Sequence, residues 1–171
     1  MKRLLNIYNK MLKLFLTPNL YAKSIGVNLG KNVYLSTKNC SSEPYLINIG
    51  DNCRIAKDVC FFTHGGLYTL RNYNEKLYNQ LEVFGDIHIG NNVYLGQGCY
   101  IMPGVIIGSN SIIGAGSIVT RDIPENMLAV GNPAKVISSI DDFGLRMLQK
   151  GTQKSRKDLS ISEIIEMAKR K

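Results

Sequence analysis

The chain has no tryptophan, only five prolines and only two histidines, His64 and His88, among its 171 residues. Its four cysteines never form a Cys-x-x-Cys pair, so we expect neither a cysteine-built zinc site nor a disulfide framework. No apolar run is long enough to span a membrane. Asn6, Asn9 and Lys10 interrupt the N-terminal segment where a secretory signal needs an unbroken apolar stretch. We therefore expect a soluble cytoplasmic protein.

Acidic side chains are few: 13 Asp and Glu stand against 21 Lys and Arg, which gives a formal charge of +8. This excess favours anionic ligands, an acidic partner surface, or contacts between the charged ends of an oligomer. No basic stretch carries interleaved aromatic residues, so the sequence does not predict a nucleic-acid partner. The length predicts one domain with short attachments, and 44% hydrophobic residues suffice for a substantial core.

The dominant feature of the chain is a repeat of six residues. From residue 89 the sequence reads IGNNVY, LGQGCY, IMPGVI, IGSNSI and IGAGSI, and the pattern recurs in shifted frames at 29–34 and 49–66. Position one of each block is apolar, position five is a small or branched residue such as Val, Cys or Ser, and Gly, Asn and Asp fill the turns between them. This period fits a very short strand followed by a turn, not a helix. Three blocks then make one triangular coil, and coils stack about 4.8 Å apart.

The repeat is interrupted twice. In "FFTHGG" (61–66) the count of six stops after His64 and resumes near residue 83, which predicts a loop at 65–82 extruded from the coil. A shift of two residues near Cys40 predicts a bulged turn.

The two ends of the chain follow a helical pattern instead. Residues 2–16 space their apolar side chains as a helix does, and we expect this helix to cap the first coil rather than to anchor the chain in a membrane. Ser160 and Glu163 form a capping-box pattern, which predicts a helix at 159–169. The expected division is a helical cap at 1–24, a β-helix at 25–137 and a helical tail at 138–171.

This repeat resembles the left-handed parallel β-helix of the hexapeptide-repeat acyltransferases, and the handedness rests on that resemblance alone. "IGDNCRIAKDVCFFTHGG" looks like the segment of sugar and polysaccharide O-acetyltransferases in which a Thr-His pair precedes an extruded loop. Gly65 stands where many of those proteins have aspartate. Residues 89–137, ending in "GNPAKVI", are similar to the C-terminal signature of galactoside and xenobiotic acetyltransferases that use CoA. The resemblance implies an all-β core of about five coils with short helices at both ends.

Other proteins with this coil fit less well. Zinc carbonic anhydrases need three histidine ligands, and this chain has two histidines. Sugar nucleotidyltransferases carry a nucleotide-binding domain in front, where only about 24 residues stand here. We expect a CoA-dependent O-acetyltransferase that acts on a saccharide, with acetyl-CoA as cosubstrate and no metal. N-acetylation of an amino sugar, an antibiotic acceptor and a non-catalytic assembly module remain alternatives.

His64 is the candidate general base, because it stands directly before the break in the repeat. Imidazole, with an ordinary pKa of about 6.5, suits removal of a proton from an attacking hydroxyl. We expect Glu82 or Asp58 to orient its ring. His88 lies between two inward isoleucines, so we expect its ring to point outward.

The resemblance implies the rest of the site and the oligomer. It implies an oxyanion donor in the stretch Gly96–Gln97 of a neighbouring subunit, and hence a homotrimer with active sites between subunits. Outward tyrosines at 34, 94 and 100 would supply surface for side-by-side packing. The candidate acetyl-CoA contacts are Gly96, Gln97, Gly114, Ala115, Thr120, Arg121 and Lys135. The candidate sugar contacts in the loop are Tyr68, Arg71 and Glu82.

Overall fold

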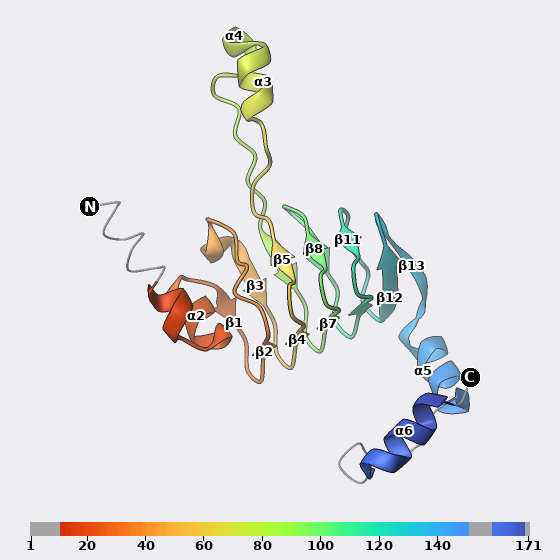
Figure 1. The fold of residues 1–171 in the computed structure, drawn as a ribbon. Helices are drawn as coiled ribbons and strands as arrows, with labels where there is room; N and C mark the ends of the chain where they lie inside the picture. The colour runs from red at the N-terminus through yellow and green to blue at the C-terminus, as the bar shows by residue number, and fades with distance from the viewer. Residues whose placement is uncertain (1–10, 151–158, 170–171) are drawn as a thin grey trace.

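Short strands stacked in three sheets form the body of the molecule (Figure 1). The computed structural model describes residues 11–150 and 159–169. Sheet A contains β1 (Asn28–Leu29), β3 (Ile47–Ile49), β6 (Ile87–Ile89) and β9 (Ile106–Ile107). Sheet B contains β2 (Tyr34–Leu35), β4 (Arg54–Ile55), β7 (Tyr94–Leu95), β10 (Ile112–Ile113), β12 (Met127–Gly131) and β13 (Ala134–Ser139). Sheet C contains β5 (Cys60–Phe61), β8 (Tyr100–Ile101) and β11 (Ile118–Val119).

The chain visits sheets A, B and C in turn, so each circuit is one coil of a parallel β-helix. Where the six-residue period is unbroken, a residue lies beside the one 18 positions later, as Asn92 does beside Asn110. Every pairing between coils is parallel, and among the named strands of the described residues only the closing β12–β13 hairpin is antiparallel. The fifth and last circuit reaches sheet A through a bridge between Ile107 and Ile123 and then ends in sheet B at β12.

Inward side chains from all three sheets form one continuous core. The largest fully buried side chains include Ile47, Ile55, Ile87, Leu95, Ile101, Ile107 and Ile113. Burial of each such side chain contributes roughly 1.5–3 kcal/mol. Cys53 and Cys99 fill the small position of their blocks, where each thiol donates to a backbone carbonyl at 3.1 Å. The apolar positions of the repeat therefore predict the core correctly.

Asparagines shape the corner that precedes sheet B. Asn32, Asn52, Asn92, Asn110 and Asn126 all have φ between 54° and 61°, a left-handed conformation that asparagine tolerates better than most residues. Their side-chain amides also bond from coil to coil, at 3.1 Å between Asn32 and Asn52 and at 2.9 Å between Asn110 and Asn126. The corner is thus held by both the turn and a side-chain ladder.

Helix α2 (Pro18–Ser24) covers the open edge of the first coil. The Asn19 side chain donates to the carbonyl of Val33 at 2.7 Å and accepts from the N–H of Leu35 at 3.0 Å. It therefore bonds the free edge of β2 as a neighbouring strand would. Tyr21 and Ala22 bury their side chains against the coil.

The helix predicted at 2–16 as part of this cap is described only from residue 11. Residues 2–10 lie outside the described part of the chain, whereas 11–15 are helical. Met11, Leu14 and Phe15 are 55%, 74% and 75% exposed. Leu12 and Leu16 of the same turn are half-buried, whereas α2 buries Tyr21 and Ala22, so α2 supplies the buried part of the cap.

The C-terminal region holds two helices, α5 (Ile140–Lys150) and α6 (Ile161–Lys169). The predicted capping box of α6 is confirmed: the Ser160 N–H donates to the Glu163 carboxylate at 2.9 Å, and the Glu163 N–H donates to the Ser160 hydroxyl at 3.3 Å. Helix α5 lies within the helical tail expected at 138–171, although its bounds were not predicted, and Ser139 accepts from the Asp142 N–H at its start. None of the helices in the described residues is long and apolar enough to cross a bilayer.

The segment at 65–82 forms an arm that projects from the side of the β-helix (Figure 1). Its stem is a short pair of antiparallel segments. In it the Gly65 N–H donates to the carbonyl of Val83, and the Gly85 N–H donates to the carbonyl of Thr63. Two short helices, α3 (Tyr68–Tyr73) and α4 (Glu75–Tyr78), stand at its far end.

Candidate active site

His64 lies at the corner where sheet C ends and the arm begins. It forms an isolated antiparallel bridge with Phe84, and the two rings meet edge to face with centroids 6.4 Å apart. Its side chain is 47% exposed. The histidine is therefore fixed by the stem of the arm yet open to solvent, as a group that must meet an acceptor needs to be.

Glu43, one coil earlier, is the partner of this histidine. Its carboxylate accepts a hydrogen bond from the buried Thr63 hydroxyl at 2.7 Å and lies 2.8 Å from His64 Nδ1. The prediction that Asp58 or Glu82 orients the ring is wrong. Asp58 sits in an exposed turn, and Glu82 pairs with Arg71 in the arm.

The surroundings of Glu43 favour its charged form. Burial raises the pKa of the Glu43 carboxyl, but hydrogen bonds from Thr63, His64 and Ser42 outweigh it and hold that pKa below its usual value. The ionised carboxylate can only accept, so Nδ1 carries the proton in the neutral ring. His64 Nε2 is then the unprotonated nitrogen, and it forms no hydrogen bond within the described residues.

The extra residues of the first frame shift put Glu43 in position. Asn32 pairs with Asn52, 20 positions later, where regular coils differ by 18. The added length falls beside the 3₁₀ turn Pro44–Leu46, and the Ser41 hydroxyl anchors it by accepting from the Thr63 N–H at 3.2 Å. The frame shift lies one coil before His64, at the same corner of the β-helix. This shift is the sequence signal that could have identified Glu43.

Gly96 is not the oxyanion donor, which corrects the prediction. Its N–H already donates to the carbonyl of Ile113 at 2.8 Å inside the coil. A side chain on Gly96 would also clash with the backbone nitrogen of Ala115, so the residue serves close approach of two coils. The next N–H, that of Gln97, has no partner among the described residues and remains a candidate donor.

The predicted cofactor contacts fall into three places. Gln97, Gly114 and Ala115 share the corner between sheets B and C, where the Gly116 N–H donates to the Gln97 carbonyl. Thr120 and Arg121 follow β11 at the corner between sheets C and A, the same edge of the β-helix as His64. The structure also puts Lys135 on β13, opposite Val130.

One chain holds the candidate base and the candidate donor far apart. Gln97 lies at the corner between sheets B and C. In the coil that contains His64, Lys57 lies at this same corner, and its carbonyl accepts from the Gly98 N–H. From Lys57 the chain crosses sheet C to reach Thr63, a span of roughly 15–20 Å at about 3.3 Å per residue. A single thioester carbonyl cannot contact both groups of the same chain.

The three predicted sugar contacts lie on the arm. Arg71 donates to the Leu81 carbonyl at 2.9 Å and forms an ion pair with Glu82, so these two charges bind each other. Tyr68 is 73% exposed and lines a hollow on the arm with four polar neighbours. The lining residues of this hollow are Tyr68, Arg71, Asn72, Glu75 and Asn79.

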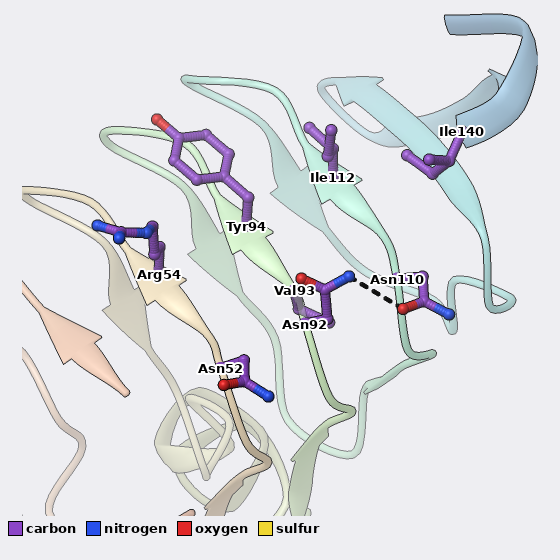
Figure 2. A pocket seen from close by; sticks show the side chains of 8 residues that line it. All are labelled: Asn52, Arg54, Asn92, Val93, Tyr94, Asn110, Ile112 and Ile140. Carbon is purple, nitrogen blue, oxygen red and sulfur yellow. Dashed lines mark hydrogen bonds between the residues drawn. The ribbon is translucent and has the colours of Figure 1, made fainter. Parts of the chain in front are cut away.

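A shallow pocket also lies on the outer face of sheet B, shown in Figure 2. Arg54, Tyr94 and Ile112 project into it from neighbouring strands, and Ile140 at the start of α5 closes one end. Asn52, Asn92 and Asn110 of the corner ladder line one side of it (Figure 2). None of its lining residues is a predicted site residue, so the pocket is separate from the His64 corner.

His88 is on the outer face of sheet A, as predicted. Its side chain is 51% exposed, and its Nε2 lies 3.8 Å from the Asp86 carboxylate. Within the described residues, no three His, Cys, Asp or Glu side chains gather as a metal site would require.

The bacterial transferase hexapeptide (six repeats) family matches residues 86–121. Protein CapG of Staphylococcus aureus is 40% identical over 131 residues, which cover 74% of each chain. A maltose O-acetyltransferase from Clostridium difficile 630 has 30% identity and a TM-score of 0.57, and the match covers 77% of this chain and 84% of that one. A galactoside acetyltransferase in complex with coenzyme A has 29% identity and a TM-score of 0.55, over 90% and 87%. The chain belongs to the hexapeptide-repeat acyltransferases and has their left-handed parallel β-helix.

Proposed function

We propose that this chain is an O-acetyltransferase that moves the acetyl group of acetyl-CoA to a hydroxyl of a saccharide, such as a surface polysaccharide or its precursor. The observation that carries the proposal is the pair of Glu43 and His64, which leaves Nε2 free to accept a proton at the foot of the arm. The names of the maltose and galactoside enzymes support a saccharide acceptor. We expect the reaction in the cytoplasm, where acetyl-CoA is made.

In the proposed step, His64 Nε2 takes the proton of the acceptor hydroxyl while that oxygen bonds to the thioester carbonyl carbon. The carbonyl oxygen becomes an oxyanion, and the Glu43 carboxylate stabilises the imidazolium. When the oxyanion collapses, the carbon–sulfur bond breaks and the sulfur takes the proton from Nε2. The products are an acetyl ester and the free CoA thiol, and His64 returns to its starting tautomer.

We propose that the oxyanion is bound by the Gln97 N–H of a second copy of the chain, in a homotrimer. A preorganised backbone donor is worth about 3–4 kcal/mol in comparable sites. The span of sheet C between the two corners of one chain supports a shared site. Exposed aromatic side chains on neighbouring faces support side-by-side packing, since Tyr34, Tyr94 and Tyr100 are 59%, 44% and 42% exposed.

Acetyl-CoA in this proposal runs along the corner of Gln97 and Ala115. Both residues have backbone N–H groups without partners in the described part of the chain, and these can bind the amides of the pantetheine arm. Arg121 and Lys135 are exposed cations for the phosphates, and Thr120 adds a hydroxyl donor.

The test is release of CoA thiol from acetyl-CoA in the presence of a panel of saccharides and matched amino sugars, with mass spectrometry of the product. We expect thiol release that depends on a saccharide and a product that is an ester, cleaved by mild base. Thiol release with amino sugars alone, and a base-stable amide product, would instead make the protein an N-acetyltransferase. The absence of CoA binding would exclude the whole proposal.

A further inference from the structure

The first 42 residues of the chain carry positive charge without any acidic side chain among them. Seven of the 21 Lys and Arg residues and none of the 13 Asp and Glu residues precede Glu43. The first 42 residues therefore carry a formal charge of +7, and the remaining 129 carry +1. The seven cations are Lys2, Arg3, Lys10, Lys13, Lys23, Lys31 and Lys38.

Four of these cations lie in the described part of the chain, and no carboxylate there forms an ion pair with them. The ion pairs among the described residues do not involve Lys13, Lys23, Lys31 or Lys38. Lys38 donates to the backbone carbonyl of Lys13 at 2.6 Å, at the end of the 11–15 helical turn. Asp51 accepts from the Lys31 backbone N–H and Glu43 accepts from the Thr63 hydroxyl, and neither carboxylate forms an ion pair with these four cations.

Large apolar side chains stand exposed beside these cations. Met11, Leu14 and Phe15 precede helix α2, and Leu20 on α2 is itself 55% exposed. Because α2 already covers the first coil, these side chains are not needed for the cap. Figure 1 shows this region at one end of the β-helix, with α5 at the opposite end.

We propose that this N-terminal surface, formed by residues 11–38, binds the surface of a membrane that contains anionic phospholipids. Exposed cations attract the lipid phosphates, and leucine and phenylalanine can enter the boundary between headgroups and acyl chains. A nucleic acid would match the cations but would leave the aliphatic side chains without a partner. The inference does not rest on the proposed activity, although it would bring the enzyme to acceptors carried on lipid.

Vesicle flotation tests this proposal directly with the full-length protein. Vesicles of phosphatidylcholine with phosphatidylglycerol are compared with vesicles of phosphatidylcholine alone, at about 0.05 and 0.5 M salt. We expect binding to the anionic vesicles that weakens at least tenfold at high salt, because screening removes attraction between exposed charges.

Two pairs of substitutions separate the two parts of the surface. Leu14→Gln with Phe15→Gln should weaken binding at least tenfold. Lys13→Glu with Lys23→Glu should do so as well, since each cation near an anionic surface contributes roughly a fivefold gain. The matched control is Leu145→Gln with Leu148→Gln on α5, whose side chains are 60% and 59% exposed. It should bind as the unchanged protein does.

Several results would overturn the proposal. They are no binding to anionic vesicles at low salt, equal binding to neutral vesicles, or equal loss in the α5 control. A fall in the sedimenting mass of the Leu14→Gln, Phe15→Gln protein would instead show that a second copy covers this surface. Circular dichroism melting of each variant checks folding, and the salt and lipid dependence of the unchanged protein tests the proposal even where a variant fails to fold.

Discussion

Each ring nitrogen of His64 has a separate task in the proposed mechanism. Nδ1 is held by a carboxylate that hydrogen bonds keep ionised, and Nε2 is left to exchange a proton with the acceptor. Replacing His64 with alanine should lower kcat by roughly 10²- to 10⁴-fold, the usual contribution of a positioned base. The KM for acetyl-CoA should change little. Steady-state kinetics checks this.

His88→Ala is the matched control, because His88 is equally exposed on another face of the same β-helix. It should keep kcat within a few-fold. A dead His88→Ala enzyme that still folds, beside an active His64→Ala enzyme, would mean that the base is assigned to the wrong histidine.

Glu43 should act through His64 rather than on the substrate. Glu43→Gln retains an acceptor but removes the charge that stabilises the imidazolium, so we expect kcat to fall roughly 10- to 100-fold, less than the loss of the base itself. The KM for acetyl-CoA should stay unchanged. A fall in acetyl-CoA affinity with normal kcat would contradict a positioning role.

The same substitution should change the dependence of stability on pH. Because the pKa of Glu43 is lowered on folding, the unfolded chain binds the proton first as the pH falls. The carboxylate therefore stabilises the fold above about pH 5, and this contribution is lost as the pH falls through the lowered pKa. Urea unfolding at several pH values should show a stability difference between the unchanged protein and Glu43→Gln that shrinks below about pH 5. A stability difference that grows as the pH falls would mean that folding raises the pKa of Glu43 instead of lowering it.

At the scale of elements, helix α2 caps the first coil mainly through the side-chain amide of Asn19. Asn19→Ala removes both hydrogen bonds to the edge of β2 and leaves the Val33 carbonyl and the Leu35 N–H unsatisfied. We expect a loss of about 1–2 kcal/mol in the free energy of unfolding. Asn28→Ala is a suitable comparison, because the exposed Asn28 side chain bonds the side chain of Asn48, at 3.2 Å, and no backbone group of a strand edge in the described part of the chain. Equal losses in the two variants would argue against the cap.

The sequence predicts regular elements well and irregular ones poorly. A period of six specifies inward and outward positions residue by residue, so the core isoleucines, the left-handed asparagine turns and the outward ring of His88 follow from it. Glu43 could not be found in this way, since it lies outside the period in an inserted turn. The sequence could not show that α2 supplies the buried part of the cap at 1–24, because helical spacing gives an apolar face but not what that face packs against.

At the scale of the whole molecule, the proposed site needs more than one chain. Sedimentation equilibrium should give about three times 19.1 kDa. The trimer should persist in the His64→Ala protein, because the imidazole is half exposed and its partner Glu43 belongs to the same chain. A monomer at micromolar concentration would remove the shared site.

The measurement that tests the shared site most directly is activity of mixed trimers. One parent carries His64→Ala, and the other carries Ala115→Phe, which obstructs the proposed acetyl-CoA corner at an exposed turn. Each parent alone should be nearly inactive. After the two are unfolded and refolded together in equal amounts, about a quarter of the sites should combine an intact histidine with an intact corner, and a matching share of activity should return. A mixture as inactive as its parents, although trimeric, would contradict an active site built from two copies of this chain.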